Sequence, residues 1–344
     1  MKGLAARLLT TTIIRTPAGD GVGIGYRLRH VRRCLVFATI FFALATPAAA
    51  FEPKVMESVV TVLPLWPGYE RGGQARRPLG SAPEGTAVAI RPDGFLVTAL
   101  HVVERATEIT VRLPDGRETP ARLVGADSAT DLALLGIDAD LPVLEAAPNP
   151  ALGDPVCAVG NQFGLGLSVT CGVVSAVHRS GIGFNPAEDF VQTDAAVNPG
   201  ASGGALVDAQ GRLVGILSAI FTKSSDANIG VNFATSIALV ERVVDDLMAG
   251  GQVRRADTGM RLGDLASAER IDQAGARVIA ITPGGAAARA GLIEGDVVTA
   301  IGSRRVKGRN DARAAIALAR PGQRLVIAVT RGGGGITVEL TLPP

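Results

Sequence analysis

The chain has 344 residues, of which 47% are hydrophobic and 19% charged, with a formal net charge of +2. A chain this long and this apolar can bury more than one core, which excludes general intrinsic disorder. The small net charge and the scattered arginines form no basic groove, so nucleic acid is not an expected partner. The 43 glycines and 20 prolines, with 4% aromatic residues, indicate many tight turns between short strands.

Residues 1–50 have the pattern of a leader. A basic stretch, 27–33, precedes an apolar run, 34–44, which leads into small residues that end in Ala48-Ala49-Ala50. This order predicts a secretory signal peptide cleaved after Ala50, and therefore a periplasmic mature chain. The alternative is an uncleaved anchor that holds the chain at the membrane, facing the periplasm. The run is short for about 30 Å of hydrocarbon, which favours cleavage.

Residues 51–250 are expected to form one mainly β domain. Short β-branched runs separated by Gly, Pro, Asn and Asp follow one another, for example at 87–90, 109–113, 132–137 and 169–177. Many short strands at this spacing predict a sandwich or a barrel. A helical pattern then runs from Ser236 to Met248 and ends at Gly250-Gly251.

Residues 251–344 are expected to form a second, smaller α+β domain. Four strand-like stretches are interspersed with a short helix at 286–290 and a longer helix at 311–319. Asn310 is the expected N-cap of the longer helix, and Pro321-Gly322 is its expected stop. The size of this unit is that of a small binding module.

A serine surrounded by small residues, Gly200-Ala201-Ser202-Gly203-Gly204, is the candidate nucleophile. Glycines let the backbone turn sharply, present the hydroxyl and direct amides at a developing oxyanion. The pattern Gly-x-Ser-x-Gly also describes the nucleophile elbow of α/β-hydrolases. That fold places its histidine after the serine in chain order, and no histidine follows Ser202.

Three histidines are available as the general base. His30 lies in the leader, and His178, beside Arg179-Ser180-Gly181, is predicted to be a solvated turn residue. His101 is predicted to end an apolar strand over 95–100, and it is the only good partner left for Ser202, so it is the predicted base.

The third catalytic group must be a carboxylate that orients the imidazole. Asp131 opens the apolar run 132–135, where the start of a buried strand would fix it, and is the predicted acid. Asp127 is instead predicted to form a turn, and Asp194, near the serine, could instead steady the nucleophile loop. The order His101, Asp131, Ser202 is that of the chymotrypsin-like enzymes.

These motifs, read together, resemble the catalytic blocks of HtrA/Deg proteases. The resemblance rests on segments that occur in the order of that family, at 97–103, 130–135, 158–164, 172–176, 192–196, 200–204 and 229–234. It covers about residues 55–344 and implies a mainly β fold, a chymotrypsin-like double β-barrel followed by a smaller α+β PDZ domain. It also implies an oxyanion hole made by the amides of Gly200 and Ser202. Ala201, Ala205 and Leu100 depart from the residues usual in the family.

Two substrate-binding regions are predicted. In the chymotrypsin-like fold the pocket floor lies about six residues before the serine, at Ala196, and the walls are Leu217, Ser218, Ala219 and Ile220. An apolar pocket without an acid predicts cleavage after small or medium aliphatic residues. The stretch 290–298 resembles the hallmark of a PDZ domain, whose groove would be lined by Met260 and Leu262 and would capture a peptide C-terminus by β-augmentation.

The resemblance implies a serine endopeptidase that degrades or processes unfolded exported proteins, in protein quality control and the response to stress. Its expected partners are unfolded polypeptides, peptide C-termini and two further copies of the chain in a homotrimer. No cofactor is expected, and no cluster has metal-ligand spacing. A glycine-rich stretch, 21–25, has no βαβ context and does not indicate a dinucleotide. The alternative function is a catalytically weak chaperone or peptide sensor.

Two cysteines remain after the leader. Cys157 and Cys171 lie in strand-like stretches joined by the glycine-rich segment 161–167. If this hairpin is centred on Gly164, the two cysteines face each other across an antiparallel pair. The sequence leaves open whether they form a disulfide or remain two small thiols in the barrel core.

Overall fold

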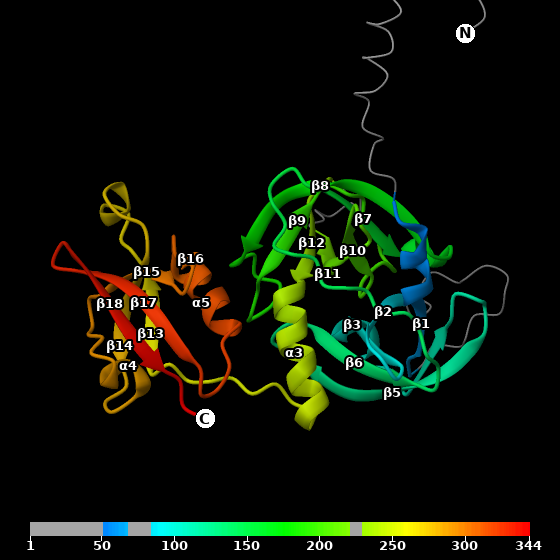
Figure 1. Ribbon diagram of the computed structural model, residues 1–344, viewed down its shortest axis with the longest axis horizontal. Coiled ribbons are helices and arrows are strands. Elements are labelled where there is room, and N and C mark those ends of the chain that lie inside the picture. The colour runs from blue at the N-terminus through cyan, green and yellow to red at the C-terminus, as the bar shows by residue number, and fades with distance from the viewer. Residues whose placement is uncertain (1–50, 68–83, 221–228) are drawn as a thin grey trace, which may run out of the picture. The chain divides into compact units, whose positions relative to one another are not determined.

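The computed structural model describes residues 51–67, 84–220 and 229–344 (Figure 1). The leader predicted at 1–50 and its cleavage site lie outside the described residues. A short 3₁₀ helix, η1 (Pro53–Ser58), leads into the first barrel. Its six strands close in the order β1-β2-β3-β6-β5-β4. They are β1 (Val59–Leu65), β2 (Gly85–Arg91), β3 (Phe95–Ala99), β4 (Glu108–Arg112), β5 (Glu118–Asp127) and β6 (Leu132–Ile137).

A second six-stranded barrel follows and closes in the order β10-β11-β12-β9-β8-β7. Its strands are β7 (Pro155–Gly160), β8 (Ser168–Arg179), β9 (Phe190–Thr193), β10 (Ala205–Asp208), β11 (Leu213–Ile220) and β12 (Asn232–Ser236). The double β-barrel that the resemblance implied is therefore confirmed. Each barrel is closed by antiparallel pairing throughout, which leaves no free sheet edge in either one.

Helix α3 (Ile237–Gly250) packs against strands of both barrels (Figure 1). The side chain of Ser236 caps it by accepting a hydrogen bond from the Leu239 N–H, and Gly251 ends it in the left-handed region at φ 71°. Its apolar face, with Val240 and Val244 fully buried, shares one core with Val88 of the first barrel and Ile216 of the second. Burial of each such side chain stabilises by about 1.5–3 kcal/mol, which fixes the two barrels against each other.

The C-terminal domain is an antiparallel sheet in the order β13-β14-β15-β17-β18, with β16 paired to β15. Its helices and strands are β13 (Met260–Asp264), η3 (Glu269–Ile271), β14 (Ala276–Ile281), α4 (Ala286–Arg289), β15 (Val297–Ile301), β16 (Arg304–Arg305), α5 (Arg309–Ala317), β17 (Arg324–Arg331) and β18 (Gly334–Thr341). They enclose a separate apolar core that includes Val278, Ala312 and Ile327.

One predicted boundary in this domain is wrong. Helix α5 begins at Arg309 with Gly308 as its N-cap, so Asn310 lies within the first turn and caps nothing. The neighbouring Asp311 reaches back instead, and its Oδ2 accepts the N–H of Lys307 at 2.9 Å. An acidic side chain in the first turn also complements the positive end of the helix dipole.

Among the helices of the described residues, none is long and apolar enough to cross a membrane.

Cys157 and Cys171 form a disulfide. Cys157 and Cys171 are register partners between β7 and β8, as expected for a hairpin centred on Gly164. Their Cα atoms lie 4.0 Å apart, and the two sulfur atoms are bonded. The structure therefore decides between the two alternatives that the sequence left open.

Candidate active site

The His101 side chain is held by a carboxylate. His101 lies in the one-turn helix α2 (Leu100–Val103) that follows β3, whereas the sequence predicted the end of a strand. Asp131 stands immediately before β6 with φ 57°, and its carbonyl accepts the N–H of Leu100 at 2.9 Å. Its Oδ1 accepts the backbone N–H of His101 at 2.9 Å, and its Oδ2 lies 2.6 Å from His101 Nδ1. The structure thus brings these two predicted residues together.

The imidazole is accessible while its carboxylate partner is sheltered. The side chain of His101 is 47% exposed, and that of Asp131 is 18% exposed. β3 and β6 are paired directly, with Ala99 opposite Leu132. His101 follows the end of β3 and Asp131 precedes the start of β6, so both lie at the same edge of this strand pair. A histidine ring oriented at Nδ1 leaves Nε2 available to exchange a proton with a nucleophile.

Ser202 lies on the loop between β9 and β10, beside the end of β3. Its carbonyl accepts the N–H of Thr86 on β2 at 2.9 Å, which ties the serine of the second barrel to the first. The next residue, Gly203, has φ 83°, and a Cβ there would lie 2.9 Å from the backbone nitrogen of Ala99 and closer still to Thr86. Glycine is therefore required, and the loop packs against the strand that leads to His101.

Two backbone amides of this loop are available to bind an anion. The carbonyl of Pro199 accepts the N–H of Phe163 at 2.7 Å, so in a trans peptide the N–H of Gly200 points the opposite way. Ala201 donates its N–H to Asn198. Among the described residues, no acceptor is found for the N–H of Gly200 or of Ser202. These are the two amides predicted to form the oxyanion hole.

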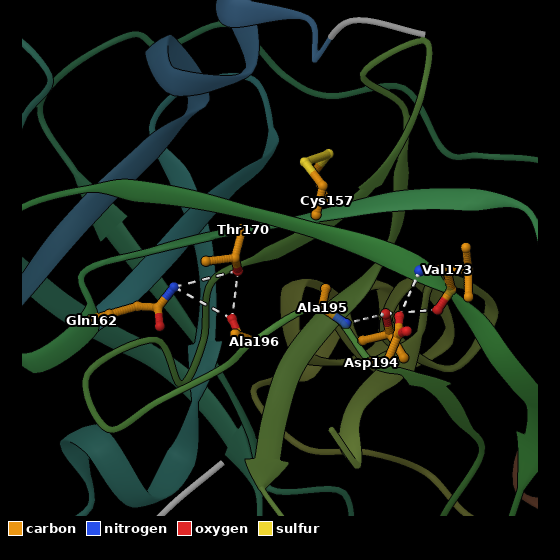
Figure 2. Close-up of a disulfide and its surroundings, with 9 residues drawn as sticks. Cys157, Gln162, Thr170, Val173, Asp194, Ala195 and Ala196 are labelled. Carbon is orange, nitrogen blue, oxygen red and sulfur yellow. Dashed lines mark hydrogen bonds between the residues drawn. A yellow bond between two sulfur atoms is a disulfide. The ribbon is translucent and has the colours of Figure 1, made fainter. Parts of the chain in front are cut away.

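The residues predicted for the primary pocket lie on two neighbouring segments of the second barrel. The carbonyl of Ala196 accepts hydrogen bonds from Thr170 and Gln162 (Figure 2). The predicted walls occupy the end of β11, where Leu217 and Ser218 are buried and the backbone of 219–220 pairs with Phe233 and Asn232 of β12. The Leu217 side chain belongs to the core of the second barrel.

Two aspartates considered as alternatives to Asp131 have other partners. Asp194 is exposed, and its Oδ1 accepts the N–H of Val173 at 2.7 Å, which ties the segment before the serine to β8 (Figure 2). Asp127 is buried at the end of β5, and its Oδ2 accepts the hydroxyl of Thr130 at 2.5 Å. Asp127 is thus more than the turn former expected, because its carboxylate also supports the loop that presents Asp131.

His178 was predicted to be a solvated turn residue; it is exposed as expected, but the turn assignment is wrong. It lies on β8 with φ 54°, and its Nδ1 is 3.0 Å from Oδ1 of the fully buried Asp189. The hydroxyl of Ser236 donates to the other oxygen of that carboxylate at 2.6 Å. Burial by itself would raise the pKa of Asp189, but the hydrogen bond from His178, the charge of Arg304 and the hydrogen bond from Ser236 outweigh it and lower the pKa. The pairing comes from separate strands, so no local signal in the sequence announces it.

The predicted peptide-binding residues of the C-terminal domain lie on β13. This strand forms one end of the sheet and is paired with β14 along one side. Met260 and Leu262 are partly buried against the core of the domain, and α5 packs beside the strand. A strand with an unpaired side next to a helix can accept an added peptide strand. Within the described parts of the chain, no group of three or more His, Cys, Asp or Glu side chains is arranged to hold a metal ion.

Comparison with known proteins agrees with this architecture. Residues 85–216 match the family model of the trypsin-like peptidase domain, and residues 248–342 match that of the PDZ domain. With the double barrel, these matches define the class of the protein as a trypsin-like peptidase domain joined to a PDZ domain.

Relatives narrow this class to one family. The chain is 39% identical over 285 residues to the periplasmic serine endoprotease DegP of Escherichia coli K12, and 36% identical over 268 residues to the periplasmic pH-dependent serine endoprotease DegQ of that strain. These alignments cover 80% and 75% of this chain, and the chain spans 59% of the length of each relative. The HtrA-type protease AlgW with a tripeptide superposes at a TM-score of 0.66 and 36% identity, covering 86% of this chain and 97% of that one. The chain belongs to the HtrA family of serine proteases.

Proposed function

We propose that this chain is a serine endopeptidase in which Ser202, His101 and Asp131 form the catalytic triad. Ser202 Oγ attacks the carbonyl carbon of the scissile peptide bond while His101 Nε2 takes the hydroxyl proton. The amides of Gly200 and Ser202 bind the oxyanion of the tetrahedral intermediate. His101 then returns the proton to the leaving amine, and the acyl-enzyme forms. A water molecule, deprotonated by His101, hydrolyses that ester and restores the serine.

The two-point contact between Asp131 and His101 carries this proposal. An aspartate that accepts from both the backbone and the ring of one histidine fixes its tautomer, and it stabilises the imidazolium that forms in the transition state. The two amides without acceptors at Gly200 and Ser202 add the second requirement for acyl transfer, and the likeness to DegP and AlgW adds a third line of support.

Covalent labelling tests the proposal directly. A fluorophosphonate probe forms a stable adduct only with a serine that a neighbouring base activates, so we expect it to modify Ser202, as located by mass spectrometry of the tryptic peptide. The Ser202→Ala variant should remain unlabelled and should not cleave casein. Wild-type protein that binds unfolded casein but takes no label would instead be the chaperone or peptide sensor considered as the alternative.

We further propose that the enzyme acts on unfolded exported proteins in the periplasm, in protein quality control under stress. In this account residues 1–50 are the cleaved leader, 51–250 the protease domain and 251–344 the PDZ domain, which binds peptide C-termini beside β13. The names of DegP and DegQ as periplasmic endoproteases and the match to a PDZ domain support this. Fractionation of cells should find the mature chain, beginning at Phe51, in the periplasm.

The same family resemblance leads us to propose a homotrimer built through the N-terminal part of the protease domain. Sedimentation velocity on the mature chain measures this directly. We expect one species of about three times the chain mass that persists on dilution, and a monomer at all concentrations would contradict it.

A further inference from the structure

The disulfide lies on a hairpin that supports the base of the primary pocket. Cys171 is exposed, and successive side chains of a strand point to opposite faces. The neighbouring Thr170 therefore points away from the disulfide and toward the segment that precedes Ser202, as Figure 2 shows. The bridge fixes the register of β7 and β8 at the residue next to Thr170.

Two polar side chains of this hairpin converge on one backbone oxygen. The hydroxyl of Thr170 donates to the carbonyl of Ala196 at 2.5 Å, and Nε2 of Gln162 donates to the same oxygen at 3.4 Å (Figure 2). Gln162 Nε2 also lies 3.5 Å from the Thr170 hydroxyl. Its Oε1 accepts from Nδ2 of Asn198 at 2.6 Å, so one buried amide links residues 196 and 198.

The hairpin and the loop touch closely along this stretch. A Cβ at Gly172 would lie 2.5 Å from the nitrogen of Ala195, and a Cβ at Gly160 would lie 2.9 Å from the Cα of Ala201. No room remains for the segment to shift toward the hairpin without a steric clash. The position of the pocket base therefore follows the position of the hairpin.

We propose that Thr170 and Gln162 are specificity-determining positioning residues that act through the carbonyl of Ala196, and that the Cys157–Cys171 disulfide keeps them in place. This inference rests on the proposed function, since it assigns the pocket of that protease. Neither side chain is required to touch substrate. Each one restricts where the backbone at the pocket base can lie, and hence which side chain of a substrate the pocket accepts.

Thr170→Val tests the first residue, because valine keeps the shape and removes the hydroxyl. Loss of one hydrogen bond to this partly buried carbonyl predicts a decrease of about threefold to tenfold in kcat/KM for a peptide with Val at the cleaved position. The preference for Val over Phe at that position should change as well, since the pocket base is no longer held against the hairpin. Thr170→Ser restores the hydroxyl and should recover both values. Thr119→Val on β5 is the matched control and should change neither.

Gln162→Leu should change the ratio of Val to Phe cleavage, as Thr170→Val does. The rate of labelling by a small fluorophosphonate, which does not depend on the side chain in the primary pocket, should stay within about twofold of the wild-type rate. This separates the two proposals. If wild-type protein takes no label, the proposed function fails. If it does and both variants keep the wild-type ratio of Val to Phe cleavage, only the positioning role is overturned.

The disulfide is tested by reduction. A mild reductant should change the Val-to-Phe ratio of the wild-type enzyme to that of the Cys157→Ala/Cys171→Ala variant, and it should leave the ratio of that variant unchanged. Re-oxidation should restore the wild-type ratio. An unchanged ratio in fully reduced wild-type protein, with the free thiols counted in the same sample, would refute the role of the bridge.

Discussion

Asp131 contacts His101 at two points, through Oδ1 to the backbone N–H at 2.9 Å and through Oδ2 to ring Nδ1 at 2.6 Å. The first contact positions the one-turn helix, and the second orients the ring within it. Because Asp131 adopts a left-handed conformation just before β6, its side chain turns back toward the end of β3, where His101 begins its turn. One carboxylate therefore binds both the backbone N–H and the ring of the proposed base.

Substituting Asp131 by Asn should separate these two tasks. Asparagine Oδ1 can still accept the His101 N–H, but its amide group cannot accept a proton-bearing Nδ1, so the wrong tautomer is favoured. We expect a decrease in kcat of about 10⁴-fold, by analogy with the same change in a Ser-His-Asp protease, and an unfolding midpoint close to wild type. Asp138→Asn, on the loop that follows β6, is the control. A variant within tenfold of wild type would remove Asp131 from the triad.

The residue at the proposed pocket base predicts substrate preference. Ala196 offers no charge, and the neighbouring Leu217 and Ser218 are buried, so the site provides no partner for a basic side chain. An unpaired cation is costly to desolvate, whereas a small or medium aliphatic side chain is not. A mixed peptide library analysed by mass spectrometry should show cuts mainly after Val, Ala or similar residues. Cuts mainly after Lys or Arg would contradict the assignment.

A buried ion pair predicts acid sensitivity of the C-terminal domain. Asp296 is 1% exposed, and Arg331 contacts both of its oxygens at 2.7 Å. Burial opposes ionisation, but the hydrogen bond from Arg331 and that from the Ile293 N–H outweigh it and lower the pKa of Asp296. A lowered folded-state pKa contributes stability that is fully present above the unfolded value of about 3.9 and is lost as the pH falls below it.

The change Asp296→Asn should therefore destabilise this domain at neutral pH by about 2 kcal/mol, the scale of a hydrogen bond to a charged group. It should also flatten the loss of stability below pH about 4. Hydrogen exchange of the peptide that contains β15, measured in the full chain at pH 7 and pH 3, reports both effects. Asp272→Asn, at an exposed position, is the control and should match wild type at both pH values.

The Cys157–Cys171 disulfide should stabilise the second barrel. The two residues are 14 apart in sequence, and closing a loop of that length contributes about 3 kcal/mol in the chain-entropy model. Mature protein denatured without reductant should show no free thiols, and the Cys157→Ala/Cys171→Ala variant should unfold at lower urea concentration. Two free thiols per unreduced chain would exclude the bridge.

Much of this protein could be predicted from the sequence because its strongest signals are local. Turn residues at short intervals indicated a sandwich or a barrel, and the order of motifs indicated the family, which implied two barrels. Ser236 and the glycines at 250–251 located the ends of α3 to within two residues. His101 was also predicted as the base, since only three histidines are available, His30 lies in the predicted leader and His178 was interpreted as a turn residue.

Contacts between distant strands were decided only by the tertiary structure. Cys157 could pair with Cys171 only if the register was right, and a shift of one residue would have put their side chains on opposite faces. The partnership of His178 with the buried Asp189 joins two strands, and Gln162 meets Ala196 and Asn198 across 34 and 36 residues. A sequence encodes propensity and periodicity directly, but which buried polar groups satisfy one another depends on barrel closure, which brings these segments together.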